Sequence, residues 1–475
     1  MSAQPSAAAE LLARLGGIVG PHGLITDPGK MVSYLTDWRG LYQGRAAAIV
    51  HPANTEEVAA IVRLCAGTRA PIVPQGGNTG MCGGATPDTT GNAIVVTLDR
   101  MNRIIELDVL TNTVTVEAGC VLANIQRAAA DANRLFPLRL GAEGSCQIGG
   151  NLSTNAGGVN VLRYGNTRDL VLGLEVVLAD GRVWNGLRSL RKDNTGYDLK
   201  HLFIGAEGTL GIITKAVLKL FPRPNNSSTA LATTRNAEGA VELLRLLRGH
   251  CGDRISAFEI MSRNCLDMVF RRIPGTRDPL PQAQPWYVLA ELTDMRAGSA
   301  LRGEFERALA EGIERGLVSN ATIAENQAQA QALWRLRETI PEAARIEGLI
   351  YRHDIAVAVS RIPQFIAAAS RALETRFPEA RIICFGHLGD GNLHFNAFVP
   401  GRERNDAQAR AATDVNRIVH DIVHQFGGSV SAEHGIGQLK RGELKRYKSE
   451  VELQLMRTLK QALDPHDLMN PGKLL

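Results

Sequence analysis

Short apolar runs alternate with polar segments along most of the chain, and the first clear example spans residues 46–74. The runs AAAIV and PIVP, which end at Val50 and Pro74, contain β-branched residues that favour strands. Between them, Asn54 is followed by a threonine and two glutamates, a typical start of a helix. The pattern therefore predicts a strand, a helix and a second strand in this order.

The alternation continues to a break at residues 221–228. We expect strands at Ala93–Leu98, Ile104–Asp108 and Thr113–Glu117, and then a helix from about Val121 to Asn133. The apolar run LVLGLEVVLADG ends in an Asp-Gly pair typical of a hairpin turn. The Pro/Asn/Ser-rich segment FPRPNNSS then indicates a domain boundary. Short strands mixed with helices favour an α+β fold over a regular βαβ winding.

The composition is that of a globular protein with more than one domain, because 475 residues are too many for one ordinary hydrophobic core. The 53 Lys and Arg barely outnumber the 48 Asp and Glu and are scattered, which argues against nucleic-acid binding. The seven cysteines form no CxxC pair, so we expect free thiols and no iron–sulfur cluster. The N-terminus lacks a secretory pattern, and no apolar run approaches roughly 18 residues, so we expect a cytoplasmic protein without a transmembrane segment.

Three segments rich in small residues stand out: GGNTG at 76–80, GGNLSTNAGG at 149–158 and EGTLGIIT at 207–214. Consecutive glycines after a strand can point several backbone N–H groups into one concavity, which suits a phosphate. The first loop alone is equally explained as a tight turn between strands. No GxGxxG motif follows a strand and opens a helix, so a dinucleotide site of the Rossmann type is not expected.

Taken together, these loops resemble the FAD-binding domain of the vanillyl-alcohol oxidase superfamily, also called the p-cresol methylhydroxylase type. In that family the first loop often carries a histidine bonded to the flavin. Asn78 stands in the loop here, so the resemblance implies non-covalent FAD. The residues that would contact FAD by this resemblance are Pro74, Gly76, Gly77, Asn78, Thr79, Gly80, Gly141, Ser145, Gly149, Gly150, Asn151, Thr154, Asn155, Gly157, Gly158, Glu207, Gly208, Gly211, Ile212, Ile213 and Asn470.

A second cluster of chemically active residues lies in CFGHLGDGNLHFNAFV at 384–399. Two apolar arms flank GDGN, which predicts a hairpin. In a hairpin centred after Asp390, His387 faces His394 with Cβ atoms about 4.5–5.5 Å apart, a spacing at which two imidazoles can share a metal. Asn396 falls on the same face as His394. The alternative is a polar hairpin face that carries histidines by chance.

The segment SAEHGIG at 431–437 supplies two further groups. Glu433 would add the carboxylate that the histidine pair lacks, and His434 would remain free for proton transfer. His420 and His424 lie four apart on a helical stretch, and we interpret them as one helix face rather than a metal site. Cys146 has no base beside it in the sequence, so we interpret it as a small loop residue rather than a nucleophile.

The two motifs GHLGDGNLHFN and AEHGIG together resemble the C-terminal half of the FAD-linked D-2-hydroxy-acid dehydrogenases, and the resemblance spans residues 45–473. This family includes enzymes for D-2-hydroxyglutarate, D-lactate and glycolate. The resemblance implies that a divalent metal, zinc being favoured, binds His387, His394 and Glu433. It also implies His434 as the catalytic base and, with Asn396, a contact of the substrate.

The resemblance further assigns two arginines to the substrate. Arg337, in ALWRLRETIPEA, would bind a carboxylate, and Arg352, in YRHDI, stands where the hydroxyglutarate enzyme has lysine. A pair of cations favours a dicarboxylic substrate, so D-2-hydroxyglutarate ranks before D-lactate. Pro341 replaces a threonine that touches substrate in that enzyme, which puts the exact substrate in doubt.

The implied reaction removes a proton from a metal-polarised hydroxyl through His434 and transfers a hydride to flavin N5. The electrons would leave to an electron-transfer flavoprotein or a quinone-linked partner, and a homodimer is compatible with the resemblance. The alternatives are a glycolate oxidase-type subunit of a complex, a non-catalytic flavin subunit and a non-redox alkyl transferase. The expected α+β fold combines a p-cresol methylhydroxylase-type FAD-binding domain with an α/β cap domain that contains an antiparallel sheet. We expect four parts along the chain: an N-terminal helical segment at 1–44, the FAD-binding domain at 45–223, the substrate domain at 224–463, and a segment at 464–475 that returns to the FAD-binding domain.

Overall fold

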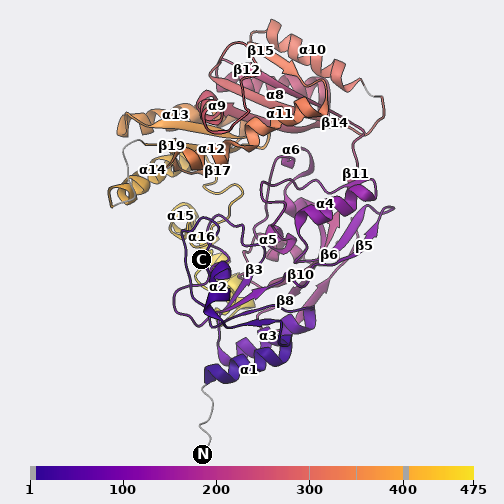
Figure 1. The fold of residues 1–475 in the computed structure, drawn as a ribbon, viewed down its shortest axis with the longest axis vertical. Helices are drawn as coiled ribbons and strands as arrows, with labels where there is room; N and C mark the ends of the chain where they lie inside the picture. Colours follow the sequence, from indigo (N-terminus) through magenta and orange to yellow (C-terminus); the bar gives the residue numbers. More distant parts are fainter. Residues whose placement is uncertain (1–6, 299, 349, 400–405) are drawn as a thin grey trace, which may run out of the picture. The chain divides into compact units, whose positions relative to one another are not determined.

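The computed structural model describes residues 7–298, 300–348, 350–399 and 406–475, so the first six residues of the expected N-terminal segment lie outside it. The chain divides into two compact units (Figure 1). Unit 1 comprises residues 1–156, 166–223 and 433–475, and unit 2 comprises residues 157–165 and 224–432. No helix among the described residues is long and apolar enough to cross a membrane.

Unit 1 contains the predicted strand, helix and strand. β2 (Ala48–Val50) and β3 (Ile72–Gln75) both run parallel to β4 (Ile94–Thr97). The connecting helix α3 (Thr55–Thr68) begins after Asn54, whose side chain accepts a hydrogen bond from the Glu57 N–H at 2.8 Å. That bond satisfies an otherwise unpaired amide of the first turn, which is the physical basis of the helix-start signal. The prediction is confirmed.

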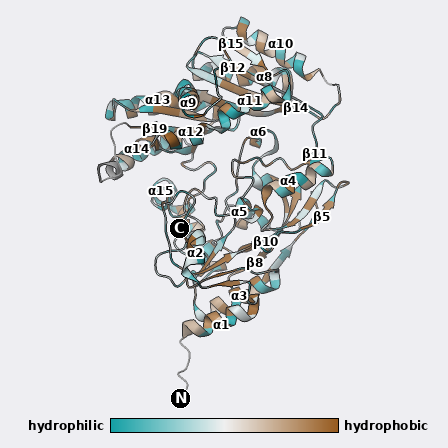
Figure 2. Cartoon of the chain, viewed as in Figure 1, coloured by the Kyte–Doolittle hydropathy of each residue, from teal (hydrophilic) through white to brown (hydrophobic). Residues whose placement is uncertain are grey.

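A second sheet of unit 1 has the strand order β5-β6-β10-β8-β9 and is antiparallel. Its bounds are β5 (Ile104–Asp108), β6 (Thr113–Glu117), β8 (Val171–Val177), β9 (Val183–Gly186) and β10 (Ile212–Lys219). The predicted Asp-Gly turn joins β8 to β9, where Gly181 has φ +80°. Strands β8 and β10 consist mainly of hydrophobic residues (Figure 2), and most of these residues are buried.

The C-terminal arm of unit 1 starts earlier than expected, since residues 433–463 also belong to this unit. Lys460 on α16 (Glu450–Leu463) donates to the carbonyl oxygen of Thr209 at 3.0 Å, and the N–H of Asn470 donates to Ile72 at 2.7 Å. The sequence break at 221–228 coincides with the change of unit after Arg223. No such break in composition marks residue 433, and the return of the chain to unit 1 was therefore expected only at residue 464.

The remaining elements of unit 1 are short or peripheral. Helix α1 packs against α3, and α2 lies next to β2. Their bounds are α1 (Ala7–Val19), β1 (Leu24–Ile25), α2 (Pro28–Leu35), α4 (Leu122–Asp131), β7 (Arg134–Leu135), α5 (Ile148–Ser153), η1 (Thr167–Leu170), α7 (Lys200–Phe203), β11 (Phe221–Pro222) and α15 (Arg441–Tyr447).

Unit 2 is built on an eight-stranded antiparallel sheet of order β15-β12-β14-β13-β18-β19-β16, with β17 also paired to β19. The strands are β12 (Asn226–Thr234), β13 (Ile255–Ser262), β14 (Trp286–Asp294), β15 (Asn320–Ile323), β16 (Ile350–Tyr351), β17 (Asp354–Ala356), β18 (Arg381–His387) and β19 (Asn392–Phe398). The predicted antiparallel sheet of this part is confirmed.

Helices cover this sheet and complete a hydrophobic core that includes Tyr287, Trp334 and Phe385. Helix α8 packs on β12, β13 and β14, and α9 packs on β13 and β18. The helices of unit 2 are α6 (Val161–Tyr164), α8 (Ala237–Cys251), η2 (Gly252–Arg254), α9 (Arg263–Arg272), α10 (Leu301–Glu314), α11 (Gln327–Glu338), α12 (Ile340–Glu347), η3 (Val359–Arg361), α13 (Ile362–Arg376), η4 (Leu388–Asp390) and α14 (Asp406–Gln425).

Candidate active site

The glycine-rich loop after β3 presents unpaired backbone donors. Among the described residues, the N–H groups of residues 76–80 have no acceptor. Asn78 lies in the left-handed region at φ +52°, and its side-chain amide donates to the carbonyl oxygens of Ser33 and Thr36 at 3.2 and 2.8 Å. This anchors the loop on α2 and its C-terminal end. A row of unpaired N–H groups held in place is suited to a phosphate.

Glycine is required where this loop meets the segment that precedes α5. A Cβ atom on Gly77 would lie 2.1 Å from the carbonyl oxygen of Ser145, and one on Gly149 would lie 2.8 Å from the Cβ of Ala118. A Cβ atom on Gly80, in contrast, would meet nothing within 4 Å. A Cβ atom on Gly76 would lie 3.5 Å from the Gly150 nitrogen, so the predicted first and second glycine segments are neighbours within unit 1.

Buried acceptors without partners lie in the same unit. Within the described chain, Gln147 Oε1, Asn151 Oδ1 and Asn470 Oδ1 accept no hydrogen bond. The amide nitrogen of Asn470 donates to the carbonyl oxygens of Gly84 and Glu207 at 2.9 and 2.7 Å, so its orientation is fixed. Unpaired buried acceptors are costly unless a ligand supplies donors. Unpaired N–H groups and unpaired acceptors together fit a dinucleotide such as FAD, which has phosphates and ring N–H groups.

Glu207 contacts the C-terminal arm of unit 1. Its carboxylate accepts hydrogen bonds from the N–H groups of Ile436 and Gly437, each at 2.7 Å. Burial raises the pKa of Glu207, and these two bonds partly oppose that rise. Glu207 and Gly208 also have positive φ values of 53° and 72°, which the predicted third segment needs for its turn. The carboxylate of Glu207 thus has a structural role beside its predicted contact with FAD.

Several other predicted FAD contacts use their polar atoms within the protein. Thr154 Oγ1 donates to the carbonyl oxygen of Gly150 at 3.0 Å, and Asn155 Oδ1 accepts from the Arg168 N–H at 2.9 Å. Ile212 and Ile213 are buried on β10. Whether these residues touch FAD stays a prediction.

Gly157 and Gly158 were expected within the FAD-binding domain, but residues 157–165 fold with unit 2. In this segment, Arg163 donates to the carbonyl oxygen of Thr293 at 2.8 Å, and α6 packs on β13. These are long-range contacts, for which the local sequence gave no signal.

The predicted hairpin is present as β18 and β19, but its register differs from the expected one. Phe385, not His387, stands opposite His394, and His387 is paired with Glu259 on β13. The prediction of directly opposed histidines is wrong because the connection is longer than a two-residue turn. It contains the 3-10 turn η4 and then Gly391 at φ +91°. The two imidazole rings still lie 6.0 Å apart between centroids.

Each hairpin histidine has a carboxylate behind it. His387 Nδ1 lies 2.5 Å from Glu259 Oε1, so Nε2 is the ring nitrogen that would bind a metal. His394 Nδ1 lies 3.8 Å from Asp354 Oδ1 on β17, and Asp354 also accepts from the Asn392 amide at 2.9 Å. Neither carboxylate was predicted. Glu259 is the sole charged residue in the buried run ISAFEIMS of β13, which is a signal that could have identified it.

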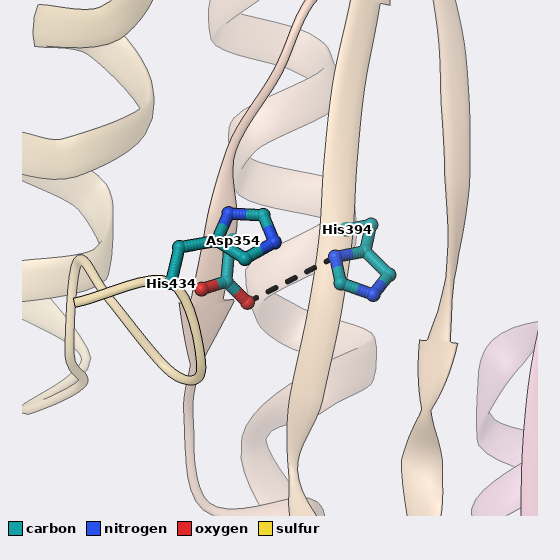
Figure 3. Close-up of side chains that lie close together, drawn as sticks. All are labelled: Asp354, His394 and His434. Carbon is teal, nitrogen blue, oxygen red and sulfur yellow. Dashed lines mark ion pairs between the residues drawn. The ribbon is translucent and has the colours of Figure 1, made fainter. Parts of the chain in front are cut away.

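Glu433 and His434 directly follow Ala432, whose N–H donates to the Asp354 carbonyl oxygen at 3.3 Å. The covalent chain therefore keeps both residues next to β17. Ligand atoms of His387, His394 and Glu433 all lie within 4.8 Å of one another. A second group with the same property is Asp354, His394 and His434, drawn in Figure 3. Two imidazoles and a carboxylate form a donor set that zinc takes, so the residues fit a metal.

Arg337 on α11 is buried and held by the same glutamate. Its Nε donates to Glu259 Oε2 at 2.6 Å, and its guanidinium lies over the Phe385 ring, 4.8 Å from the centroid. Neither Nη atom has an acceptor within the part of the chain that the structure describes. Burial opposes ionisation of Glu259, but the charges of His387 and Arg337 outweigh it and lower the pKa of Glu259 to about 2. Arg337 is thus a buried cation whose fork is open to a carboxylate.

The other predicted substrate residues, Asn396 and Arg352, lie on a strand and in a connection between two strands. Asn396 on β19 accepts a hydrogen bond from the His353 N–H at 3.0 Å through its oxygen, which leaves its amide hydrogens for a ligand. Arg352 is half-buried between β16 and β17. Pro341 lies in the first turn of α12, a position at which its missing N–H costs no helical bond.

The structure agrees with the interpretation of His420, His424 and Cys146 as structural residues. His420 is buried, with its ring 5.4 Å from that of His353, and neither His420 nor His424 joins a metal-like group among the described residues. Cys146 is buried, and burial raises the pKa of its thiol, which disfavours the nucleophilic thiolate. All seven cysteines are free and buried.

Comparison with protein families gives two matches. The model of the FAD linked oxidases, C-terminal domain, matches residues 223–474, and that of the FAD binding domain matches residues 46–186. The chain is 38% identical over 459 residues to the mitochondrial D-2-hydroxyglutarate dehydrogenase of Arabidopsis thaliana, which covers 96% of this chain and 80% of that protein. It is 37% identical over 454 residues to the D-2-hydroxyglutarate dehydrogenase of Xanthomonas citri pv. viticola, and this match covers 95% of this chain and 94% of that protein.

Solved structures share the fold at low sequence identity. p-Cresol methylhydroxylase with substrate bound has a TM-score of 0.78 at 17% identity, covering 99% of this chain and 97% of that one. An alkyldihydroxyacetonephosphate synthase has a TM-score of 0.76 at 18% identity, and the match covers 99% of this chain and 85% of that one. At such identities the likeness shows the fold alone, and it confirms the predicted p-cresol methylhydroxylase type.

Proposed function

This chain belongs to the family of FAD-linked oxidases, and we propose that it oxidises a D-2-hydroxy acid to the 2-oxo acid. D-2-hydroxyglutarate is the favoured substrate and D-lactate the next. The family membership and the relatives that carry this activity in their names support the reaction. The buried Arg337, with its open fork, supports a carboxylate-bearing substrate. Arg352, which belongs to the same unit, would bind a second carboxylate of the substrate.

The single observation that carries the metal-dependent form of this proposal is the group His387, His394 and Glu433, whose ligand atoms lie within 4.8 Å of one another. We assign these three residues to a divalent metal, with zinc favoured by the nitrogen and oxygen donors. The Glu259 carboxylate at His387 Nδ1 supports this assignment, because a ligating histidine usually has its second ring nitrogen bound to a carboxylate or carbonyl.

When bound, FAD supplies a two-electron acceptor, and a divalent cation supplies a Lewis acid that lowers the pKa of a hydroxyl. The protein's own groups provide the rest. His434 takes the proton of the substrate hydroxyl, since an imidazole near neutral pH is well matched to that transfer. Arg337 binds a substrate carboxylate, and the Asn396 amide donates to the substrate. The glycine loop of residues 76–80 would hold the pyrophosphate of FAD.

The electrons must leave the enzyme after each turnover. We propose an external acceptor, either an electron-transfer flavoprotein or a quinone-linked protein. Cytoplasmic location and a homodimeric assembly remain predictions from the sequence.

A substrate screen tests the proposal. Purified protein would be mixed with D- and L-2-hydroxy acids, with dye reduction as the readout and metal analysis on the same sample. We expect D-2-hydroxyglutarate to bleach the flavin anaerobically, and a strong chelator to abolish turnover without releasing FAD. A flavin that no hydroxy acid bleaches would favour an alkyl transferase or a non-catalytic subunit. Turnover that survives complete metal removal would remove the metal from the proposal.

A further inference from the structure

A carboxylate with no exposure to solvent lies at the centre of unit 2. Glu259 on β13 is 0% exposed and contacts two groups with the two oxygens of its side chain. Oε1 lies 2.5 Å from His387 Nδ1, and Oε2 accepts a hydrogen bond from Arg337 Nε at 2.6 Å. An ionised carboxylate is tolerated at such a depth only where partners replace its lost hydration. Here both partners are groups of the proposed site.

We propose that Glu259 is a positioning residue that fixes the metal-binding nitrogen of His387 and the substrate-binding fork of Arg337 at the same time. This inference rests on the proposed function. One residue would then control both metal affinity and the binding of a substrate carboxylate, although it would touch neither the metal nor the substrate.

The effect on His387 follows from its tautomer. A carboxylate can only accept hydrogen bonds, so Nδ1 must carry the proton in its bond to Glu259. In the neutral ring Nε2 then has the lone pair that a metal needs. The partner carboxylate also fixes the rotation of the ring. β13 and β18 are hydrogen-bonded neighbours with Glu259 in register with His387, so the geometry is built into the sheet.

The effect on Arg337 follows from the planar shape of guanidinium. Its Nε is bound to Glu259, and its face lies on the Phe385 ring. These two contacts define the plane of the group and leave the two Nη atoms for a bidentate carboxylate. Phe385 in turn lies 4.8 Å, between ring centroids, from His394. Glu259, Arg337, Phe385 and the two histidines are therefore linked by contacts into one cluster.

The variant Glu259→Gln separates this role from simple packing. If the amide nitrogen faces His387, it donates to Nδ1 and forces the proton onto Nε2, the nitrogen that should bind metal. If it faces Arg337 instead, two donors oppose each other. Either orientation breaks the hydrogen bond to His387 or the one to Arg337, while the volume of the side chain is nearly unchanged. Loss of such a partner behind a metal ligand typically costs about 10–100-fold in metal affinity.

A matched control is available on the next strand. Glu291 on β14 accepts hydrogen bonds from Trp334 Nε1 at 2.9 Å and Ser256 Oγ at 3.1 Å, and both donors are neutral. Glu291→Gln therefore removes a carboxylate from the same sheet without touching His387 or Arg337. We expect it to retain the metal affinity and the KM of the wild type.

The experiment measures zinc affinity by competition with a chromophoric chelator, and KM and kcat for D-2-hydroxyglutarate, on FAD-loaded protein. For Glu259→Gln we expect zinc binding about 10–100-fold weaker and a KM that stays raised when zinc is saturating. Glu259→Asp keeps the charge but is one methylene shorter, so it should lose part of both properties. It also serves as the test variant if the glutamine protein does not fold.

Two negative results have different meanings. Wild-type zinc affinity and KM in both Glu259 variants, with only a lower melting temperature, would overturn the positioning role and leave the proposed function intact. A wild-type protein that takes up no zinc and oxidises no hydroxy acid would overturn the proposed function and this inference together.

Discussion

At the scale of single residues, the chemistry of this protein depends on how each imidazole is held. His387 and His394 each have a carboxylate behind Nδ1, at 2.5 and 3.8 Å respectively. His434 shares a group with Asp354 and His394 in which ligand atoms lie within 4.8 Å. We assign the first two to the metal and the third to proton transfer, because Glu433 completes a set of metal ligands without His434.

This assignment predicts the effect of His434→Ala. We expect kcat for the favoured hydroxy acid to fall by roughly 10²–10⁴-fold, the usual contribution of a general base. FAD and zinc content should stay near those of the wild type, since His434 would hold neither. Stopped-flow measurement of flavin reduction checks the rate, and His424→Ala, an exposed residue on α14, is the control. A rate within a few-fold of the wild type would exclude His434 as the base.

At the scale of elements, the loop after β3 acts through its backbone. The N–H groups of residues 76–80 find no acceptor in the described part of the chain, and the shape of the loop requires glycine only at certain positions. Gly77 touches the Ser145 carbonyl too closely for any side chain, whereas Gly80 faces open space. The five-residue motif was readable from the sequence, but the difference between its glycines comes from the neighbouring segment.

Gly77→Ala should therefore abolish FAD binding, because its Cβ would lie 2.1 Å from the Ser145 carbonyl oxygen and force the two loops apart. Gly80→Ala should retain FAD, since its Cβ would meet nothing within 4 Å and its φ is not positive. The absorbance of bound flavin per mole of protein measures both variants. Equal yellow colour in the two proteins would contradict a cradle built on backbone contact.

At the scale of the whole molecule, every cysteine is buried although none forms a disulfide. The seven thiols are divided between the two units. Burial raises the pKa of the Cys65, Cys120 and Cys265 thiols to about 12 each. The free-thiol prediction from spacing is confirmed, while the reducing compartment inferred from it stays a prediction.

Thiol reactivity should therefore report global unfolding. We expect fewer than one thiol per chain to react with Ellman's reagent at pH 8 in the native protein, because the thiolate is the reactive form and burial both hides and protonates it. In denaturant all seven should react. Rapid reaction of several thiols without denaturant would show that a unit opens readily.

Much of this protein was determined by the sequence alone. The Asn54 cap, the bounds of β5 and β6, the Asp-Gly turn and the glycine segments depend on local sterics and hydrogen bonds, so a few neighbouring residues specify them. The FAD-linked family was also readable, because its motifs are continuous stretches of sequence.

Only the tertiary structure decided the rest. Glu259 is 128 positions from His387 in the chain, and the pairing of β13 with β18 that joins them depends on the packing of the whole sheet. The hairpin register, with Phe385 opposite His394, was set by the η4 turn and not by the alternating pattern. Residues 433–463 join unit 1 through long-range contacts such as that of Lys460 with Thr209. Local patterns fix which elements form, whereas burial of distant partners fixes which side chains meet.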